Sequence, residues 1–223
     1  MIIIGHRGVP SLEPENTIRS FKKAEELKVD MIELDLRLSK DNEIVIIHDY
    51  NLKKLFEIDA EVNDLTLQEL KQISLAASRE IPTLKEVLEQ ISCPLNLHIK
   101  VPGMEKQLLE LLKQFPHKIL ISSVFPKILQ KIRNLDGSIR LGLIIGKSEL
   151  HLMFILNWLV RNLNLYSIHP KNVLISFGSM PIFQQYGRKV IIWDVSTVSD
   201  YQRAQRLDAE GVITDFPQDF VKS

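Results

Sequence analysis

Eight short apolar runs, each followed by a stretch with helical periodicity, are the feature that most restricts the fold of this chain. The runs have the length and the β-branched content of buried strands. They are Ile2–Ile4, Met31–Leu38, Leu95–Ile99, Ile119–Ser122, Leu141–Ile145, Tyr166–Ile168, Val190–Val195 and Gly211–Thr214. Strands that alternate with helices indicate a parallel sheet whose helices lie outside it.

The stretches between these runs carry apolar residues at spacings of three and four, as helices do. The expected helices are Asn16–Leu27, Leu67–Ile73, Leu84–Ile91, Glu105–Phe115, Ile128–Leu135, Ser148–Asn162, Ile182–Gln185 and Ser199–Leu207. Two helix starts also match a capping box, in which a threonine precedes a glutamate by three residues. These pairs are Thr66 with Glu69 and Thr83 with Glu86.

Two connections can be predicted from short segments. The run Glu43–His48 follows the second strand after only four residues, Ser39–Asn42. A connection this short cannot hold the crossover helix that joins parallel strands, so the two runs are expected to form a hairpin. After the sixth strand, His169 and Pro170 are expected to form a turn.

Eight strand–helix units fit an α/β fold of the (β/α)8 TIM barrel type, with a short β-hairpin after strand 2. A doubly wound open sheet has the same alternation, so periodicity alone leaves both folds open. No strand is followed by the glycine-rich fingerprint of dinucleotide-binding sheets, which favours the barrel. Because no linker, repeat or low-complexity tract divides the chain, residues 1–223 are expected to form a single domain.

Composition argues against several classes of protein. The 28 basic and 28 acidic residues leave no formal net charge, so nucleic acid is not expected as a partner. The single cysteine, Cys93, excludes an internal disulfide framework.

No integral membrane segment is expected. The most apolar run, Leu152–Val160, is far shorter than the ~20 residues that a bilayer-spanning helix needs. Because this run is apolar on nearly all sides, it predicts the interface of a homodimer. No leader pattern follows Met1, and a cytoplasmic protein is therefore expected.

Polar side chains cluster where strands of the predicted barrel end. Catalytic residues of such barrels lie at the carboxyl ends of the strands, which meet at one mouth. The polar residues at these ends are His6, Arg7, Glu33, Asp35, His48, His98 and Lys100.

The residue types at this mouth suit phosphodiester cleavage. The carboxylates of Glu33 and Asp35 share one face of a strand and are hard oxygen ligands for a divalent cation. Arg7 and Lys100 are cations that suit a phosphate. Two histidines can divide the work of general acid and general base near neutral pH.

A longer set of motifs resembles the glycerophosphodiester phosphodiesterase family. The motifs occur in the family's order and span nearly the whole chain. They are Gly5-His6-Arg7-Gly8, Pro14-Glu15-Asn16-Thr17, Ile32-Glu33-Leu34-Asp35-Leu36, Ile46-Ile47-His48-Asp49, Ile81-Pro82-Thr83-Leu84, Leu97-His98-Ile99-Lys100, Trp193 and Gly211-Val212-Ile213-Thr214-Asp215-Phe216-Pro217. Each motif alone is common, whereas the ordered set is highly specific.

The resemblance implies metal-dependent hydrolysis of a small-molecule glycerophosphodiester to glycerol 3-phosphate and an alcohol. It implies that the glycerol 2-hydroxyl attacks phosphorus and that water then opens the cyclic phosphate. His6 and His48 would be the catalytic acid/base pair, with Glu15 and Asn16 behind the first histidine. Trp193 would form the pocket wall, although a core position fits it equally well.

The resemblance also implies ligands and phosphate contacts. Glu33, Asp35 and His98 would bind one divalent metal ion, and Arg7 with Lys100 would hold the phosphate. The family usually has Glu-x-Lys where this chain has His98-Ile99-Lys100. The family implies Mg²⁺ or Ca²⁺, whereas an imidazole removes one negative charge and also admits Mn²⁺, Co²⁺ or Zn²⁺. The site is then either active with such metals or degraded, and the retention of the other motif residues favours activity.

Two other functions stay open. One is a lysophospholipase D-like lipid phosphodiesterase, which an open mouth with an apolar rim would favour. The other is a non-catalytic relative with a degraded metal site, which binds phosphodiesters through Arg7 and Lys100. His98 alone supports this second alternative.

Overall fold

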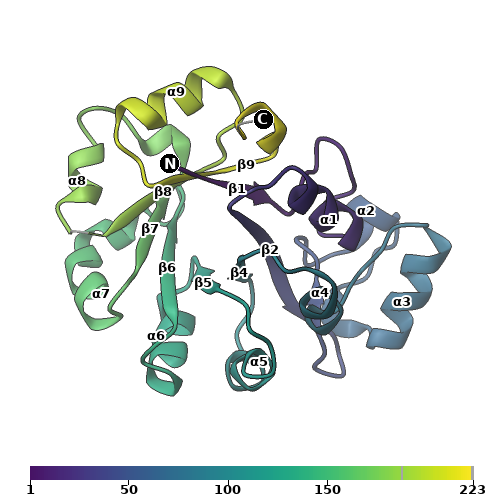
Figure 1. Ribbon diagram of the computed structural model, residues 1–223. Coiled ribbons are helices and arrows are strands. Elements are labelled where there is room, and N and C mark those ends of the chain that lie inside the picture. Colours follow the sequence, from purple (N-terminus) through teal and green to yellow (C-terminus); the bar gives the residue numbers. More distant parts are fainter. Residues whose placement is uncertain (187, 222–223) are drawn as a thin grey trace.

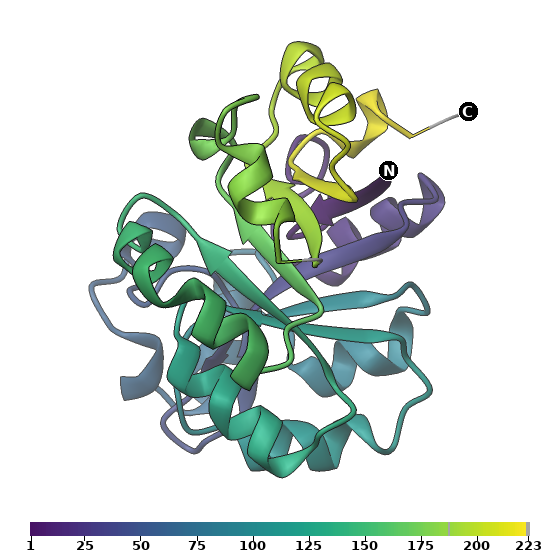
Figure 2. The same ribbon diagram turned by 90° about the vertical axis from the view of Figure 1, so that its left-hand side faces the viewer.

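Eight parallel strands close into a barrel in the computed structural model, which describes residues 1–186 and 188–221 (Figure 1). The strands are β1 (Ile2–His6), β2 (Met31–Leu38), β4 (Leu95–Ile99), β5 (Ile119–Ser123), β6 (Arg140–Ile145), β7 (Ser167–Pro170), β8 (Lys189–Trp193) and β9 (Gly211–Thr214). Each pairs in parallel with its neighbour, and β1 pairs with both β2 and β9, which closes the sheet. The first and last strands therefore lie side by side, and the N-terminus lies on the same side of the molecule as the last described residues, up to 221 (Figure 2). The predicted TIM barrel is confirmed.

Helices surround the strands and cover the outer face of the sheet (Figure 1). They are α1 (Ile18–Glu26), α2 (Lys53–Phe56), α3 (Leu67–Ala76), α4 (Leu84–Gln90), α5 (Glu105–Leu112), α6 (Pro126–Leu135), α7 (Leu156–Asn162), α8 (Met180–Gln184) and α9 (Val198–Arg206), with 3-10 turns η1 (Val62–Asp64), η2 (Leu150–Ile155), η3 (Asn172–Leu174) and η4 (Pro217–Asp219). Both predicted capping boxes are present, at the starts of α3 and α4. Among the described residues, no helix has the length and apolar character needed to cross a membrane.

The predicted hairpin is confirmed, because β3 (Ile44–Ile46) pairs antiparallel with the end of β2. Beyond it, α2, η1 and α3 pack on a small core of their own beside the barrel. That core consists of Val45, Ile47, Leu52, Phe56, Val62, Leu70 and Ile81. The sequence did not predict α2 or η1, since elements of three or four residues show no measurable periodicity.

The predicted helix over Ser148–Asn162 is divided into η2 and α7. Leu152 and Leu156 are buried, whereas the side chains of Phe154 and Trp158 are 93% and 57% exposed. The run is therefore apolar on its solvent side as well as on its core side. The homodimer that this pattern predicts stays a prediction.

The turn predicted at His169 is wrong, because this residue lies within β7 and is fully buried. Its register partner is Ile144 of β6. Two positions further back on β6, Gly142 provides the space for the imidazole, since a Cβ there would lie 2.7 Å from His169 Nε2. A neighbouring strand thus makes room for the side chain, and the sequence around the histidine itself does not show this.

Successive side chains of a strand point to opposite faces of the sheet, so the barrel has one apolar cluster outside it and another inside it. Outward side chains such as Leu34 and Leu97 belong to the large cluster that includes the helices. Inside the barrel, a smaller apolar cluster comprises Ile4, Leu120, Ile191 and Ile213. The inward residues that follow these on the same strands, His6 among them, are mostly polar and lie toward the carboxyl ends. The apolar layer closes the barrel at one end and leaves the polar end for a site.

The turn after β1 has an unusual backbone that ties it to α1. Arg7 and Gly8 have φ angles of 55° and 92°, in the left-handed region. The Ser20 hydroxyl on α1 donates to the carbonyl oxygen of Arg7 at 3.1 Å and accepts from the amide of Val9 at 2.8 Å. A Cβ on Gly8 would collide with this hydroxyl.

Replacement of Gly8 by alanine is expected to destabilise the protein by about 1 to 3 kcal/mol, because it adds both backbone strain and a collision. Urea unfolding of the two proteins measures this difference. Gly137→Ala is the matched control, since no atom lies within 4 Å of a Cβ at that position. Equal unfolding midpoints for Gly8→Ala and the original chain would contradict the assignment of strain to this turn.

Candidate active site

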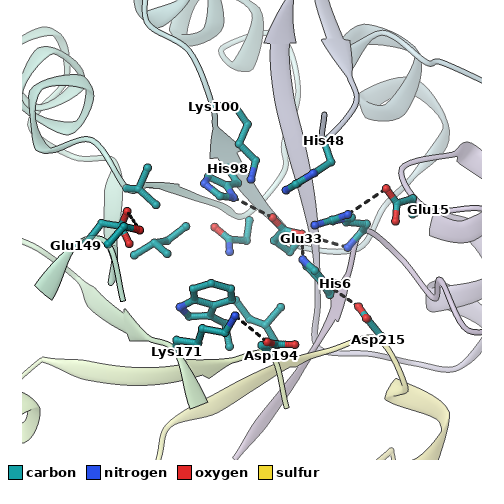
Figure 3. A pocket seen from close by; sticks show the side chains of 17 residues that line it. His6, Glu15, Glu33, His48, His98, Lys100, Glu149, Lys171, Asp194 and Asp215 are labelled. Atoms are coloured by element: carbon teal, nitrogen blue, oxygen red, sulfur yellow. Dashed lines mark hydrogen bonds and ion pairs between the residues drawn. The ribbon is translucent and has the colours of Figure 1, made fainter. Parts of the chain in front are cut away.

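A pocket of about 500 Å³ lies at the carboxyl ends of the barrel strands (Figure 3). Predicted site residues that line it are His6, Arg7, Glu15, Glu33, His48, His98, Lys100 and Trp193. The other two, Asn16 and Asp35, are buried, and each contacts Arg7. The structure therefore brings all of the predicted residues into one region.

Glu33, Asp35 and His98 form a buried group whose potential ligand atoms all lie within 4.8 Å of one another. The β2–β4 register pairs Asp35 with His98, which explains their proximity. His98 Nδ1 is 3.4 Å from Glu33 Oε1 and 3.3 Å from Asp35 Oδ1. Two carboxylates and an imidazole at this spacing fit a divalent cation, so the group could hold a metal ion.

Asp35 is surrounded by positive charge. Lys100 Nζ lies 3.1 Å from Oδ1, and Arg7 Nε lies 3.2 Å from Oδ2. The side-chain amide of Asn16 donates to Oδ2 at 3.0 Å. Burial alone would raise the pKa of this carboxyl, but Lys100, His98 and Arg7 outweigh burial and hold the pKa well below its usual range. Asp35 is therefore ionised at neutral pH.

Arg7 connects several parts of the site. Besides Asp35, its guanidinium contacts Glu15: Nη1 donates a hydrogen bond to Glu15 Oε1 at 3.0 Å. Its backbone amide donates to Glu33 Oε2 at 3.1 Å, an arrangement that the left-handed turn makes possible. Arg7 and Lys100 both line the pocket while they pair with Asp35, so each can face an anion there.

His6 is hydrogen-bonded to a carboxylate from the opposite end of the sequence. Its Nδ1 lies 2.6 Å from Asp215 Oδ1, and its Nε2 lies 3.9 Å from Glu33 Oε2. Burial disfavours the charged imidazolium, but the bond to Asp215 and the charge of Glu33 outweigh it and raise the pKa of His6. Asp215 lies within the last motif of the sequence, directly after β9, and its position at a strand end was the available signal.

His48 has a similar partner and the opposite pKa shift. Its Nδ1 lies 2.6 Å from Asp49 Oδ1. Burial lowers the pKa of His48, and the charges of Lys100 and Arg7 lower it further, whereas Asp35 and Asp49 oppose this only in part. His6 and His48 therefore differ in charge preference: His6 favours the protonated form and His48 the neutral form.

The other side of the pocket comes from the later strands (Figure 3). Trp193 at the end of β8 lines it, and Lys171 Nζ lies 4.9 Å from the centre of the indole ring. Lys171 also pairs with Asp194 at 3.1 Å. Glu149 completes this wall and accepts a hydrogen bond from the amide of Gly146. The sequence did not single out Lys171 or Glu149, although both follow strand ends.

The chain resembles known proteins over nearly its whole length. The model of the "Glycerophosphoryl diester phosphodiesterase family" matches residues 6–219. A glycerophosphodiester phosphodiesterase of Caldanaerobacter subterraneus is 31% identical, with 99% of this chain and 96% of the relative covered.

Two solved structures show the same fold. A crystal structure of a glycerophosphodiester phosphodiesterase from Thermotoga maritima superposes with a TM-score of 0.89 at 30% identity, covering 99% of this chain and 97% of the other. A phosphodiesterase of Oleispira antarctica, in complex with the product sn-glycerol-3-phosphate, has a TM-score of 0.85 at 26% identity, with coverage of 98% and 94%. The predicted enzyme class, a phosphoric diester hydrolase, is confirmed. The chain belongs to the glycerophosphoryl diester phosphodiesterase family.

Proposed function

We propose that this protein hydrolyses glycerophosphodiesters to glycerol 3-phosphate and an alcohol in a metal-dependent reaction. One observation carries the proposal: two histidines with opposite pKa shifts face the same pocket as a buried group of potential metal ligands. The product bound to the Oleispira antarctica relative supports the choice of substrate.

Four side chains of the pocket have separate roles in the proposed reaction. His48, which favours the neutral form, accepts the proton of the glycerol 2-hydroxyl as this oxygen attacks phosphorus. His6, which favours the protonated form, donates a proton to the leaving alcohol. Water then opens the resulting cyclic phosphate to give glycerol 3-phosphate. Arg7 and Lys100 hold the phosphate, while their contacts with Asp35 fix their orientation.

The proposed metal ligands are Glu33, Asp35 and His98. A divalent cation bound there would stabilise the negative charge that develops on the phosphoryl oxygens. The family resemblance favours Mg²⁺ or Ca²⁺, and the imidazole of His98 also admits Mn²⁺, Co²⁺ or Zn²⁺.

The function is tested by incubating the protein with glycerophosphocholine, glycerophosphoethanolamine and a lysophospholipid, each with a panel of divalent metals. Glycerol 3-phosphate and free alcohol are the expected products of the first two substrates. The absence of product with every metal would leave only the phosphodiester-binding alternative, which His98 supports.

The lysophospholipid arm tests the lysophospholipase D-like alternative. One observation favours this function: η2 begins directly after the pocket-lining Glu149, and it exposes 45% of Leu150 and 93% of Phe154. Exposed apolar side chains thus follow the pocket lining in the sequence, and a lipid substrate would need such side chains at the edge of the pocket. Faster turnover of the lysophospholipid than of both water-soluble diesters would establish the lipid activity as the main one.

Other expectations from the sequence stay predictions. They concern a single domain, a cytoplasmic location and the absence of nucleic acid as a partner.

His6→Ala and His48→Ala are each expected to lower kcat by at least ~100-fold, because each removes one proton-transfer group. Steady-state assays of glycerol 3-phosphate release measure the loss. His117→Ala is a suitable control, since this histidine lies outside the pocket and contacts the carbonyl oxygen of Ile91. Full activity in either pocket variant would remove that histidine from the mechanism.

His98→Glu is expected to shift the metal preference toward Mg²⁺ and Ca²⁺, because it restores a third carboxylate and its charge. Activity and metal affinity, compared across Mg²⁺, Ca²⁺, Mn²⁺, Co²⁺ and Zn²⁺, measure the shift. An unchanged metal profile would show that residue 98 is not a ligand.

The pH dependence of kcat/KM tests the assignment of acid and base. The active form needs neutral His48, present above its lowered pKa, and protonated His6, present below its raised pKa. Asp215→Asn removes a hydrogen bond that raises the pKa of His6, so the alkaline limb is expected to move to lower pH. The matched variant Asp49→Asn is expected to move the acid limb to lower pH instead. Movement of the opposite limb in either variant would reverse the assignment.

A further inference from the structure

The inside of the barrel next to the potential metal ligands contains a group of buried polar atoms without partners. Among the described residues, these are both amide atoms of Asn96, Nε2 of His98, Oγ of Ser122 and Nδ1 of His169. Asn96, Ser122 and His169 are fully buried, and His98 is 8% exposed. Since buried polar atoms in proteins are nearly always hydrogen-bonded, each of these atoms requires a partner.

The strand register places these residues together. His98 pairs with Ser122, Ser122 with Gly142, and Gly142 with Ser167, across four neighbouring strands. The imidazole of His169 occupies the position that a side chain on Gly142 would take. The ring of His169 therefore lies inside the barrel over β6, at the same level as Ser122 on the neighbouring strand β5. Asn96 is two residues before His98 on β4 and shares its inward face.

A metal bound to one ring nitrogen of His98 leaves the other ring nitrogen in need of a hydrogen-bond acceptor. His98 Nδ1 is the atom near Glu33 and Asp35. A neutral imidazole carries one N–H, so a metal at Nδ1 puts the proton on Nε2. A metal-binding histidine almost always donates this second N–H to an acceptor, which fixes its ring orientation. Because His98 Nε2 is buried, its acceptor must be buried as well.

We propose that His169, together with Ser122 and Asn96, positions His98 for metal binding by accepting its Nε2–H through buried water. The proposal rests on the metal site of the proposed function. A buried water needs two to four polar partners, which these side chains supply.

His169 has the properties of such an acceptor. Its Nε2 is 2.8 Å from the Ser167 hydroxyl, so Nε2–H can donate there and leave Nδ1 free to accept. Burial, with a smaller effect from His98, lowers the pKa of His169 to about 3, so the ring is neutral. His169 is a positioning residue, because it acts through His98 and does not line the pocket.

The test compares Zn²⁺ binding by calorimetry in the full chain and in variants. His169→Phe keeps a ring of similar size and removes both nitrogens, and Ser122→Ala removes one hydroxyl. Both are expected to weaken Zn²⁺ binding by about 10- to 100-fold, the usual effect of losing a partner behind a ligand. His169→Asn retains polar atoms and is expected to recover part of the affinity. Ser74→Ala is the control, since this buried serine bonds the amide of Ile81 in the small second core.

A second measurement does not depend on the folding of the His169 variants. Nitrogen-15 NMR of the Zn²⁺-bound original chain is expected to show His98 protonated at Nε2, with a slowly exchanging proton. Ser122→Ala is expected to speed this exchange, whereas Ser74→Ala is not. A rapidly exchanging Nε2 proton in the original chain would overturn the proposal.

His98→Ala separates this proposal from the metal site itself. If His98→Ala loses Zn²⁺ affinity while His169→Phe and Ser122→Ala bind Zn²⁺ like the original chain, the metal site stands and the positioning role is refuted. If His98→Ala binds Zn²⁺ unchanged, His98 is not a ligand, and the proposed metal site fails together with the positioning role.

Discussion

The fully buried carboxylate of Asp35 is the constraint on which the rest of the site depends. A buried charge is tolerated only when its oxygens are paired and hydrogen-bonded. Here Arg7 from the β1 turn, Asn16 before α1, and Lys100 after β4 all converge on it. One side chain of β2 therefore fixes three separate segments, and the residues available for a phosphate are oriented by the same contacts.

The barrel can contain such a polar interior because its stability comes mainly from elsewhere. The large apolar cluster between strands and helices surrounds the sheet, and a small apolar layer with Ile4 and Leu120 closes one end of the barrel. The formal charges of the whole chain also cancel, so the electrostatic properties of the pocket come from local pairing. Most of the buried charge among the described residues lies at the end of the barrel where the loops form a pocket.

His6 and His48 show how the environment gives two groups of the same chemical type different pKa values. Each is hydrogen-bonded to an aspartate through Nδ1. Burial disfavours the charged form of both. At His6 the hydrogen bond to Asp215 and the charge of Glu33 outweigh burial, whereas at His48 the charges of Lys100 and Arg7 add to burial and Asp35 offsets them only in part. The balance between burial and nearby charges therefore raises the pKa of the His6 imidazole and lowers that of the His48 imidazole.

The sequence by itself determined the strands, most of the helices and most site residues. Strand–helix alternation, the four-residue connection before Glu43 and the capping threonines are local patterns, because hydrophobic periodicity and helix capping act over a few residues. Ordered motifs identified residues from His6 to Trp193 before any contact was known. Only the tertiary structure decided that His6 pairs with Asp215, 209 positions away, and that His169 lies inside the barrel over Gly142. These contacts depend on closure of the sheet and on strand register, which place residues of distant segments at the same level.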